Sequence, residues 1–211
     1  MTNLNTSSPV ARLLGKVHGR AVHKRRIAVL AARLASMLAP GSKVLDVGCG
    51  DGRIGALLGD TVPHLEVQGA ERLPRAGCAI PCQVFDGVHL PFADRSADCC
   101  MFVDVLHHTL DPLPILREAC RVSSQFILIK DHVAEGPFDR ATLRFMDWMG
   151  NAPHGVPMTY NYLSQSQWKS LYGELDLTLV RTDRAIPLYP FPFSRIFGRN
   201  LHFISLLKIR E

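Results

Sequence analysis

The chain has 211 residues, of which 47% are hydrophobic and 20% are charged. This balance is typical of one globular domain that buries its own core, and it excludes a fibrous or fully disordered protein. We find no run of about 18 uncharged apolar residues and no secretory leader, so we expect no membrane span. The six cysteines form no C-x-x-C pair and have no histidine cluster at zinc spacing. We therefore expect reduced thiols, no metal cofactor and a cytoplasmic location.

Charge is distributed unevenly along the chain. Residues 1–45 contain eight Lys or Arg and no acid, whereas the remainder has 16 basic and 19 acidic residues. Such a segment either contacts an anionic partner, a membrane surface or nucleic acid, or covers an acidic domain as a packed helix. An organelle transit peptide has a similar composition. The helical spacing of Ile27, Leu30 and Leu34 favours the packed helix.

The predicted elements alternate between strands and helices. We expect residues 1–19 to be partly disordered and residues 20–211 to form one domain that begins with a helix over about 21–38. Strands are predicted over 43–48, 64–71, 82–87, 98–105, 125–131, 177–183 and 201–209. Helices are predicted over 51–60, 110–122, 139–149 and 164–175. This alternation predicts a Rossmann-like α/β fold, with helices on both faces of a mostly parallel sheet.

The stretch VLDVGCGDG, residues 44–52, is a strand that runs into a glycine-rich turn and a helix. Asp46 and Asp51 flank the turn, whereas a pyrophosphate at a helix N-terminus requires amides and positive charge. These carboxylates count against NAD or ATP. They favour S-adenosylmethionine, which carries an ammonium and a sulfonium and has no phosphate. The G-x-G-x-G spacing also departs from the dinucleotide fingerprint.

Acids end the next two predicted strands. Glu71 lies nineteen residues past Gly52, a separation that places a carboxylate to accept hydrogen bonds from both ribose hydroxyls. Asp86, at the end of the third strand, is placed to accept a hydrogen bond from the adenine amino group. A solvated acid at a strand end is the alternative for each.

At this point the chain resembles the class I S-adenosylmethionine-dependent methyltransferases, and most closely the small-molecule branch that includes ubiquinone- and menaquinone-biosynthesis enzymes. The resemblance covers about residues 41–132 and rests on VLDVGCGDG, GAE, FDGVHLPFADRSAD, FVDVLHH and REACRV. It implies a seven-stranded sheet with an antiparallel last strand, and methyl transfer to a small-molecule or lipid-like acceptor. One departure is the short RVSSQF, where family members often carry Pro-Gly-Gly. The cofactor contacts that the resemblance implies are Asp46, Gly48, Cys49, Gly50, Glu71, Arg72, Asp86, Gly87, Asp104, Val105 and Leu106.

Methyl transfer is an in-line displacement, so the protein must align the nucleophile and, for a hydroxyl acceptor, remove its proton. Candidate bases follow the fourth and fifth strands: His107, His108, Asp131 and His132. Histidine titrates near neutral pH and suits this role. Alternatively, the first histidine packs beside the cofactor, the second begins a helix, and no base is needed.

The stretch MDWMGNAPHGVPMTYNY, residues 146–162, is too polar for a core helix and too aromatic for a solvated loop. Long loops in compact domains are usually functional. We therefore expect residues 137–163 to form an acceptor-pocket insert, although a cover that serves packing alone is the alternative. The predicted acceptor contacts are Trp148, Asn151, His154, Tyr160 and Tyr162.

Residues 188–199, LYPFPFSRIFGR, combine aromatic and basic side chains. They form either an apolar lip with peripheral membrane contact or a connection folded over the sheet, and the connection is favoured.

Other functions fit parts of the sequence. The basic N-terminus suggests a nucleic-acid methyltransferase, but an Asn/Asp-Pro-Pro-aromatic motif is absent after the fourth strand, and Cys82 lies at the start of the third strand and not after the fourth. Nucleic acid is therefore not the expected partner. A non-catalytic S-adenosylmethionine-binding module and a nicotinamide dehydrogenase are further alternatives. The acceptor and the oligomeric state are not encoded in any motif that we find.

Overall fold

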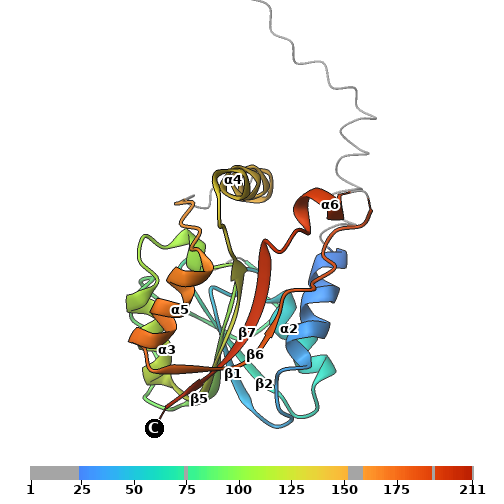
Figure 1. The fold of residues 1–211 in the computed structure, drawn as a ribbon. Coiled ribbons are helices and arrows are strands. Elements are labelled where there is room, and N and C mark those ends of the chain that lie inside the picture. Colours follow the sequence, from blue (N-terminus) through green and yellow to red (C-terminus); the bar gives the residue numbers. More distant parts are fainter. Residues whose placement is uncertain (1–23, 74–75, 152–158, 192, 211) are drawn as a thin grey trace, which may run out of the picture.

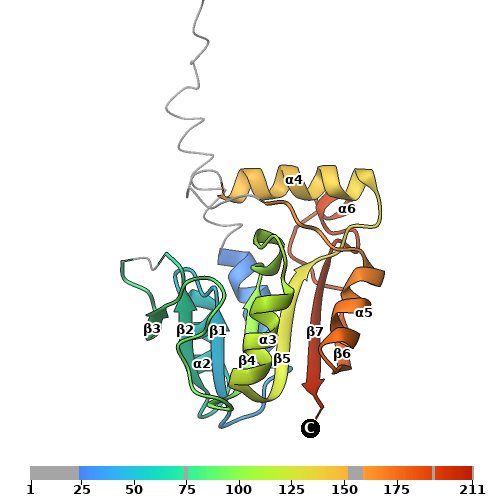
Figure 2. The same cartoon turned by 90° about the vertical axis from the view of Figure 1, so that its left-hand side faces the viewer.

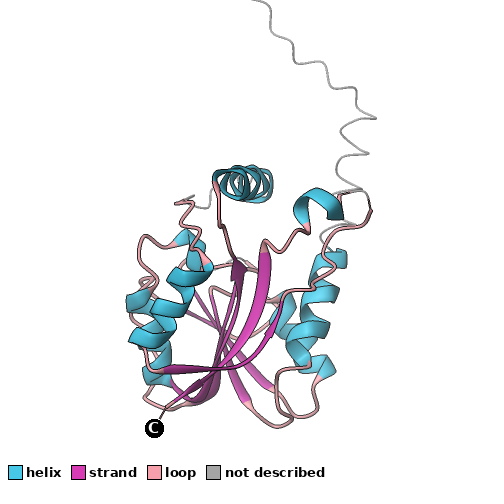
Figure 3. Cartoon of the chain, in the orientation of Figure 1, coloured by secondary structure: helices cyan, strands magenta, loops and turns pink. Residues whose placement is uncertain are grey.

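The protein contains one sheet of seven strands in the order β3-β2-β1-β4-β5-β7-β6. The computed structural model describes residues 24–73, 76–151, 159–191 and 193–210 (Figure 1). The parallel strands β1 (Lys43–Val47), β2 (Glu66–Glu71), β3 (Cys82–Val84), β4 (Ala97–Val103) and β5 (Ser123–His132) pair side by side. Strand β7 (His202–Ile209) is antiparallel to both β5 and β6 (Leu177–Asp183), which confirms the predicted α/β fold (Figure 3).

Helices cover both faces of the sheet (Figure 1). Helix α2 (Arg53–Thr61) and the N-terminal helical residues 24–35 lie on one face, where Leu30, Leu34 and Leu58 are fully buried. Helices α3 (Leu113–Val122) and α5 (Gln165–Glu174) lie on the other face, where Leu116 and Trp168 pack into a second cluster. Each such side chain contributes about 1.5 to 3 kcal/mol on burial. Central strands are thus buried on both sides, which explains their continuous apolar runs.

The described part of the basic N-terminal segment packs against the domain. Its apolar residues face the sheet, and two of its arginines form ion pairs, Arg26 with Asp104 and Arg33 with Asp183, the latter at 3.0 Å. The predicted packed helix is therefore confirmed for residues 24–35. The segment expected to be disordered, residues 1–19, lies outside the described residues.

The insert after β5 begins with helix α4 (Pro137–Asn151), which lies across the carboxyl ends of the strands (Figure 2). It is longer than the predicted 139–149. Two short elements were not predicted: a 3-10 turn η1 (Leu106–His108) after β4, and α6 (Ser194–Phe197) before β7. Both α4 and α6 stand at the end of the sheet where β1, β4 and β5 finish (Figure 1). None of the described helices has the length and apolar content needed to cross a bilayer.

Candidate functional site

The glycine turn after β1 lies at the point where the strand order reverses, between β1 and β4. Gly48 has a φ of +74°, and a side-chain carbon added there would lie 2.6 Å from a methyl carbon of Val105. Its amide donates to the carbonyl of Ala70 at 2.7 Å. Position 48 therefore requires a glycine, because the turn packs closely against the ends of both β2 and β4. In open α/β sheets ligands bind at this position.

Backbone amides orient the carboxylate of Glu71. Its Oε2 accepts a hydrogen bond from the Gly50 amide at 2.8 Å, and its Oε1 accepts from the amides of Arg72 and Leu73 at 2.8 and 3.3 Å. The side chain is thus held at the end of β2 and directly joined to the glycine turn. Carboxylate oxygens keep further lone pairs, so Glu71 can still accept hydrogen bonds from the hydroxyls of a ligand.

Asp46 is 3% exposed, and no described residue donates a hydrogen bond to its carboxylate. Burial raises the pKa of Asp46 to about 7, and the negative charge of Glu71 adds to the shift. A buried carboxylate costs free energy unless it is paired or protonated. Asp46 therefore offers an electrostatic partner to a cationic ligand, and the chemistry of S-adenosylmethionine fits this end of the sheet.

The end of β3 adds a third carboxylate, which is exposed to solvent. Asp86 accepts hydrogen bonds at 2.7 Å from the amides of Val88 and His89 and from the His89 ring, and these bonds lower its pKa below the usual range. Gly87 has a φ of +100°, and its missing side chain leaves room for Arg72. Arg72 and Gly87 therefore lie together next to Asp86.

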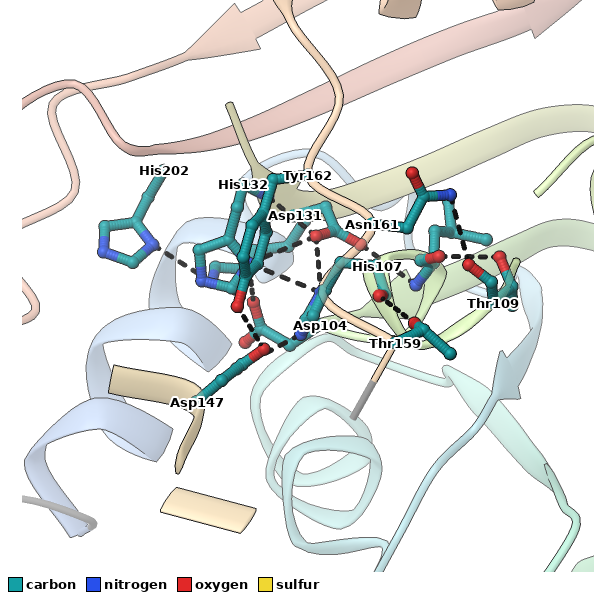
Figure 4. Close-up of polar contacts among 12 residues, drawn as sticks. Asp104, His107, Thr109, Asp131, His132, Asp147, Thr159, Asn161, Tyr162 and His202 are labelled. Atoms are coloured by element: carbon teal, nitrogen blue, oxygen red, sulfur yellow. Dashed lines mark hydrogen bonds and ion pairs between the residues drawn. The ribbon is translucent and has the colours of Figure 1, made fainter. Parts of the chain in front are cut away.

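A second group of polar side chains is buried beneath α4, at the ends of β4 and β5 (Figure 4). Asp131 is fully buried. Its Oδ1 accepts from His107 Nδ1 and the His132 amide, both at 2.7 Å, and its Oδ2 accepts from the Leu106 amide at 3.0 Å. His132 Nδ1 lies 3.2 Å from the same Oδ1. One carboxylate thus holds both histidines and the turn η1.

The two histidines differ in charge state. Burial lowers the pKa of His107, but the charge of Asp131, the hydrogen bond to it and the charge of nearby Asp147 outweigh burial and raise that pKa to about 10. His107 is therefore protonated at neutral pH. Burial, together with the charge of Lys130, lowers the pKa of His132 below its usual value, so that His132 is neutral. Burial opposes ionisation of Asp131, yet the two histidines hold its pKa well below the usual range.

Two cations hold Asp104, a residue that adopts a φ of +58°. Its carboxylate pairs with Arg26 from the N-terminal helix and with Lys130, a lysine that is fully buried in β5. Lys130 Nζ also lies 3.5 Å from His202 Nδ1 on β7. Although Asp104, His107, Asp131 and His132 bring ligand-type atoms within 4.8 Å of one another, these cations and the protonated His107 disfavour a metal ion there.

Residues 159–162 fold back onto η1 and connect it to α4. The Thr159 hydroxyl and the Asn161 backbone amide donate to the His107 carbonyl at 2.7 and 3.1 Å (Figure 4). The Tyr162 hydroxyl donates to Asp147 at 2.5 Å, and Asp147 lies 3.4 Å from His107 Nε2. The insert is therefore part of the same hydrogen-bonded group as the two histidines.

The predicted acceptor residues are not all brought together. Tyr162 is buried beside His107, with ring centroids 5.7 Å apart, and Tyr160 is half-buried with Arg144 over its ring. Trp148 is 55% exposed and lies near Phe145 instead. Asn151 is the last residue of α4, and His154 lies outside the described residues.

The half-buried His108, one of the candidate bases, lies against His107, with ring centroids 4.1 Å apart.

The sequence analysis did not indicate Arg26, Lys130, Asp147 or His202. Lys130 had a detectable signal, since a lysine within the apolar run FILIKD must be buried with a partner. A separate cavity of about 510 Å³ lies at the opposite end of the sheet, lined by the first residues of β1, β2 and β4. It is far from the glycine turn and from the histidines.

Comparison with known proteins assigns the chain to a family. Residues 19–182 match the family described as a methyltransferase domain, which is most of the chain. No curated protein sequence matches the chain.

Solved structures share the fold. An S-adenosylmethionine-dependent methyltransferase from Mesorhizobium loti is 14% identical with a TM-score of 0.63, over 84% of this chain and 96% of that one. A putative methyltransferase of Haloferax volcanii, in complex with the Trm112 methyltransferase activator, is 18% identical with a TM-score of 0.64, over 86% and 89%. A putative sarcosine dimethylglycine methyltransferase from Galdieria sulphuraria is 18% identical with a TM-score of 0.58, over 90% and 85%.

The fold and the strand-end site therefore define a class I, Rossmann-like methyltransferase that uses S-adenosylmethionine. The chain belongs to the methyltransferase domain family.

Proposed function

We propose that this protein transfers the methyl group of S-adenosylmethionine to a hydroxyl of a small, lipid-like acceptor, bound between the glycine turn and the insert of residues 137–163. The observation that carries the proposal is the neutral His132 at the end of β5, held by Asp131 next to the protonated His107. When bound, the cofactor supplies a methyl group activated by its sulfonium. Every other requirement falls on residues of the chain.

The cofactor contacts follow the carboxyl ends of β1 to β4. In this proposal Glu71 holds the ribose hydroxyls, Asp86 and Gly87 lie at the adenine, and Asp46 faces the positively charged methionine end. The amide orientation of Glu71 and the unpaired, buried carboxylate of Asp46 support these roles. Gly48 packs against the side chain of Val105, so that the glycine turn lies close to the residues that follow β4.

His132 is the proposed general base. Its Nδ1 lies near Asp131 Oδ1, so that a proton on Nδ1 is held by the carboxylate and Nε2 is left with a lone pair. Nε2 would accept the hydroxyl proton of the acceptor as the oxygen attacks the methyl carbon. His107 is already protonated and Asp131 accepts several hydrogen bonds, so neither is suited to take that proton. His108 is the second candidate.

An exposed aromatic face supports a lipid-like acceptor. Phe145 and Trp148 on α4 are 48% and 55% exposed, and Phe145 reaches Phe197 of α6 with ring centroids 6.4 Å apart. The guanidinium group of Arg195 lies over the ring of Phe191, and that of Arg199 lies over the ring of Phe138 on α4. Aromatic side chains bordered by cations suit contact with an anionic membrane surface. The resemblance to quinone-biosynthesis enzymes points to the same class of acceptor.

The acceptor class can be tested with methyl-tritiated cofactor. Purified protein is incubated with cell extract, and the extract is then separated into organic-soluble, water-soluble small-molecule, RNA and protein fractions. We expect label in the organic-soluble fraction. Label confined to RNA or protein would overturn the acceptor class, and failure to bind the cofactor by calorimetry would overturn the function itself.

The base can be tested with His132→Asn, whose amide nitrogen can replace Nδ1 at Asp131 but cannot accept a proton. We expect turnover to fall by roughly 100-fold or more, with unchanged cofactor affinity. Because the pKa of His132 is lowered, wild-type turnover should hold as the pH falls through about 6.5. The exposed His64, in the connection between α2 and β2, provides the control, and His64→Asn should keep full turnover. Equal turnover of His132→Asn and the wild type would remove His132 from the mechanism.

A further inference from the structure

Three cysteines far apart in the sequence meet beneath the glycine turn. Cys49 belongs to the turn, Cys78 to the connection between β2 and β3, and Cys82 begins β3. Their sulfur atoms all lie within 4.8 Å of one another, and the sulfurs of Cys49 and Cys82 are 3.5 Å apart. All three residues are partly exposed. The fold thus gathers half of the chain's six cysteines at one place.

Glycines make the room for these sulfur atoms. A side-chain carbon on Gly69 would lie 2.6 Å from the Cys49 sulfur, and one on Gly52 would lie 2.8 Å from the Cys78 sulfur. Backbone hydrogen bonds fix the surrounding segments. The Ala79 amide donates to the Asp51 carbonyl at 2.9 Å, and the Gly69 amide donates to the Pro81 carbonyl at 2.8 Å. The three thiols are therefore placed by backbone contacts on both sides of the cluster.

We propose that Cys49, Cys78 and Cys82 bind one zinc ion. Zinc–sulfur bonds of about 2.3 Å in a tetrahedral site place two sulfur atoms about 3.8 Å apart, which is close to the spacing in this cluster. Because the residues are partly exposed, water can complete the tetrahedron. Cys78 and Cys82 also have the C-x3-C spacing within the range of structural zinc sites.

The negative charge of three thiolates favours a divalent cation as the ligand of this cluster. Binding replaces three S–H bonds by three Zn–S bonds and releases three protons. Burial raises the pKa of the Cys49 and Cys82 thiols, and the negative charges of Asp46 near Cys49 and of Glu71 near Cys82 add to this rise. Zinc cancels two of the three thiolate charges, whereas a copper(I) ion cancels one. The protonated thiols are also slow to form a disulfide, because the thiolate is the reactive form.

A zinc ion here would tie together the segments that carry the cofactor residues. Cys49 follows Gly48, Cys78 lies between Glu71 and β3, and Cys82 precedes Asp86 on β3. Cys49 is also one of the cofactor contacts that the resemblance implies, whereas none of the three cysteines belongs to the proposed base or to the insert. The ion would stabilise the folded protein by mass action, because the unfolded chain does not preform the site.

The test uses the full chain, reduced and stripped of metal without oxygen. Zinc binding is measured by competition with a coloured chelator, and cobalt(II) serves as a spectroscopic substitute that shows sulfur-to-metal charge transfer. We expect one equivalent of zinc per chain, an affinity that rises steeply with pH, and a higher unfolding temperature with zinc. Cobalt should show thiolate coordination.

Single variants identify the ligands. Cys49→Ser, Cys78→Ser and Cys82→Ser should each lower zinc affinity at least tenfold, whereas Cys120→Ser, a partly buried thiol on α3, should leave it unchanged. Loss of binding in Cys120→Ser but not in the cluster variants would overturn the assignment, as would a wild-type chain that binds no zinc at micromolar concentration. Because zinc is measured without S-adenosylmethionine, this outcome is separate from any failure of the proposed methyl transfer.

Discussion

The two halves of the strand-end site are built in opposite ways. Around β1 to β3, carboxylates are held by backbone amides or have no hydrogen-bond donor among the described residues, as Glu71 and Asp46 illustrate. Around β4 and β5, buried charges already satisfy one another, as in the group of Asp131, His107 and His132. The carboxylates of the first half can therefore still bind a ligand, whereas the charged groups of the second half are already held in place by one another. We expect mutations in the first half to change affinity and mutations in the second half to change stability and turnover.

Asp131→Ala should give the largest effect and sharpen this contrast. It removes the carboxylate that four donors share and leaves the cationic His107 poorly paired in the interior. Breaking a buried ion pair from one side costs about 3 to 5 kcal/mol. Urea unfolding should show this loss. If the protein still folds, its affinity for S-adenosylmethionine should be close to that of the wild type.

The matched control is Asp94→Ala. Asp94 also pairs with a basic residue, Arg121, but its side chain is 74% exposed. Exposed pairs contribute about 1 kcal/mol or less. Equal losses in the two variants would contradict the difference between buried and exposed charges.

Glu71→Ala should have the reverse profile. Hydrogen bonds to a charged group contribute about 1.5 to 3 kcal/mol each, so losing the ribose contacts should weaken S-adenosylmethionine binding by roughly 100-fold. Calorimetry measures the affinity, and urea unfolding should show a smaller loss than in Asp131→Ala, because the partly exposed amides that Glu71 leaves can bind water. Glu66→Ala, an exposed acid at the start of the same strand, serves as the control. A stability loss without an affinity loss would place Glu71 with the structural carboxylates.

Tyr162→Phe should destabilise the second half by about 2 kcal/mol, since its hydroxyl donates to the charged Asp147 at 2.5 Å. Turnover should fall as well, because Asp147 supports the protonated state of His107. Tyr189→Phe is the control, because the Tyr189 hydroxyl makes no hydrogen bond within the described part of the chain. An unchanged unfolding free energy in Tyr162→Phe would show that this bond is not stabilising.

The smallest expected effect concerns Asp46, and it is a dependence of S-adenosylmethionine affinity on pH. Its pKa of about 7 means that half of the molecules carry a neutral Asp46 at pH 7. A cationic ligand favours the ionised form, so S-adenosylmethionine affinity should rise roughly tenfold between about pH 5.5 and pH 7. Titration calorimetry at several pH values measures this rise. In Asp46→Asn the rise should disappear, and a rise of the same size there would assign it to another group.

The same contrast explains what the sequence could predict. Residues 44–52 and Glu71 belong to one continuous segment of the chain. The first strand, the glycine turn and the end of the second strand follow one another there at fixed separations, so the sequence alone predicts them. All seven strands were predicted for a similar reason, since apolar runs bounded by turn residues are local signals.

The second half depends on contacts between distant segments. Arg26 and Lys130 meet at Asp104, although 78 and 26 residues separate them from it. Nothing in the local pattern of α4 distinguishes the buried Asp147 from the exposed Trp148 beside it. Such pairings follow from the sheet order and from the position of α4, which no single motif encodes. The cysteine cluster is not evident from the sequence, because Cys78 and Cys82 are separated by three residues and the fold alone brings the distant Cys49 to them.

Tyr162 holds α4 at two points. Its carbonyl accepts a hydrogen bond from Arg140 at 2.9 Å, and its hydroxyl donates to Asp147 on the same helix. These two helical residues are seven positions apart, about two turns, and so share one face. If only one end of α4 moves away from Tyr162, only one of the two hydrogen bonds breaks, and the other keeps the helix in place. Opening of α4 should therefore be a single concerted event, and its amide hydrogens should exchange with solvent at one common rate.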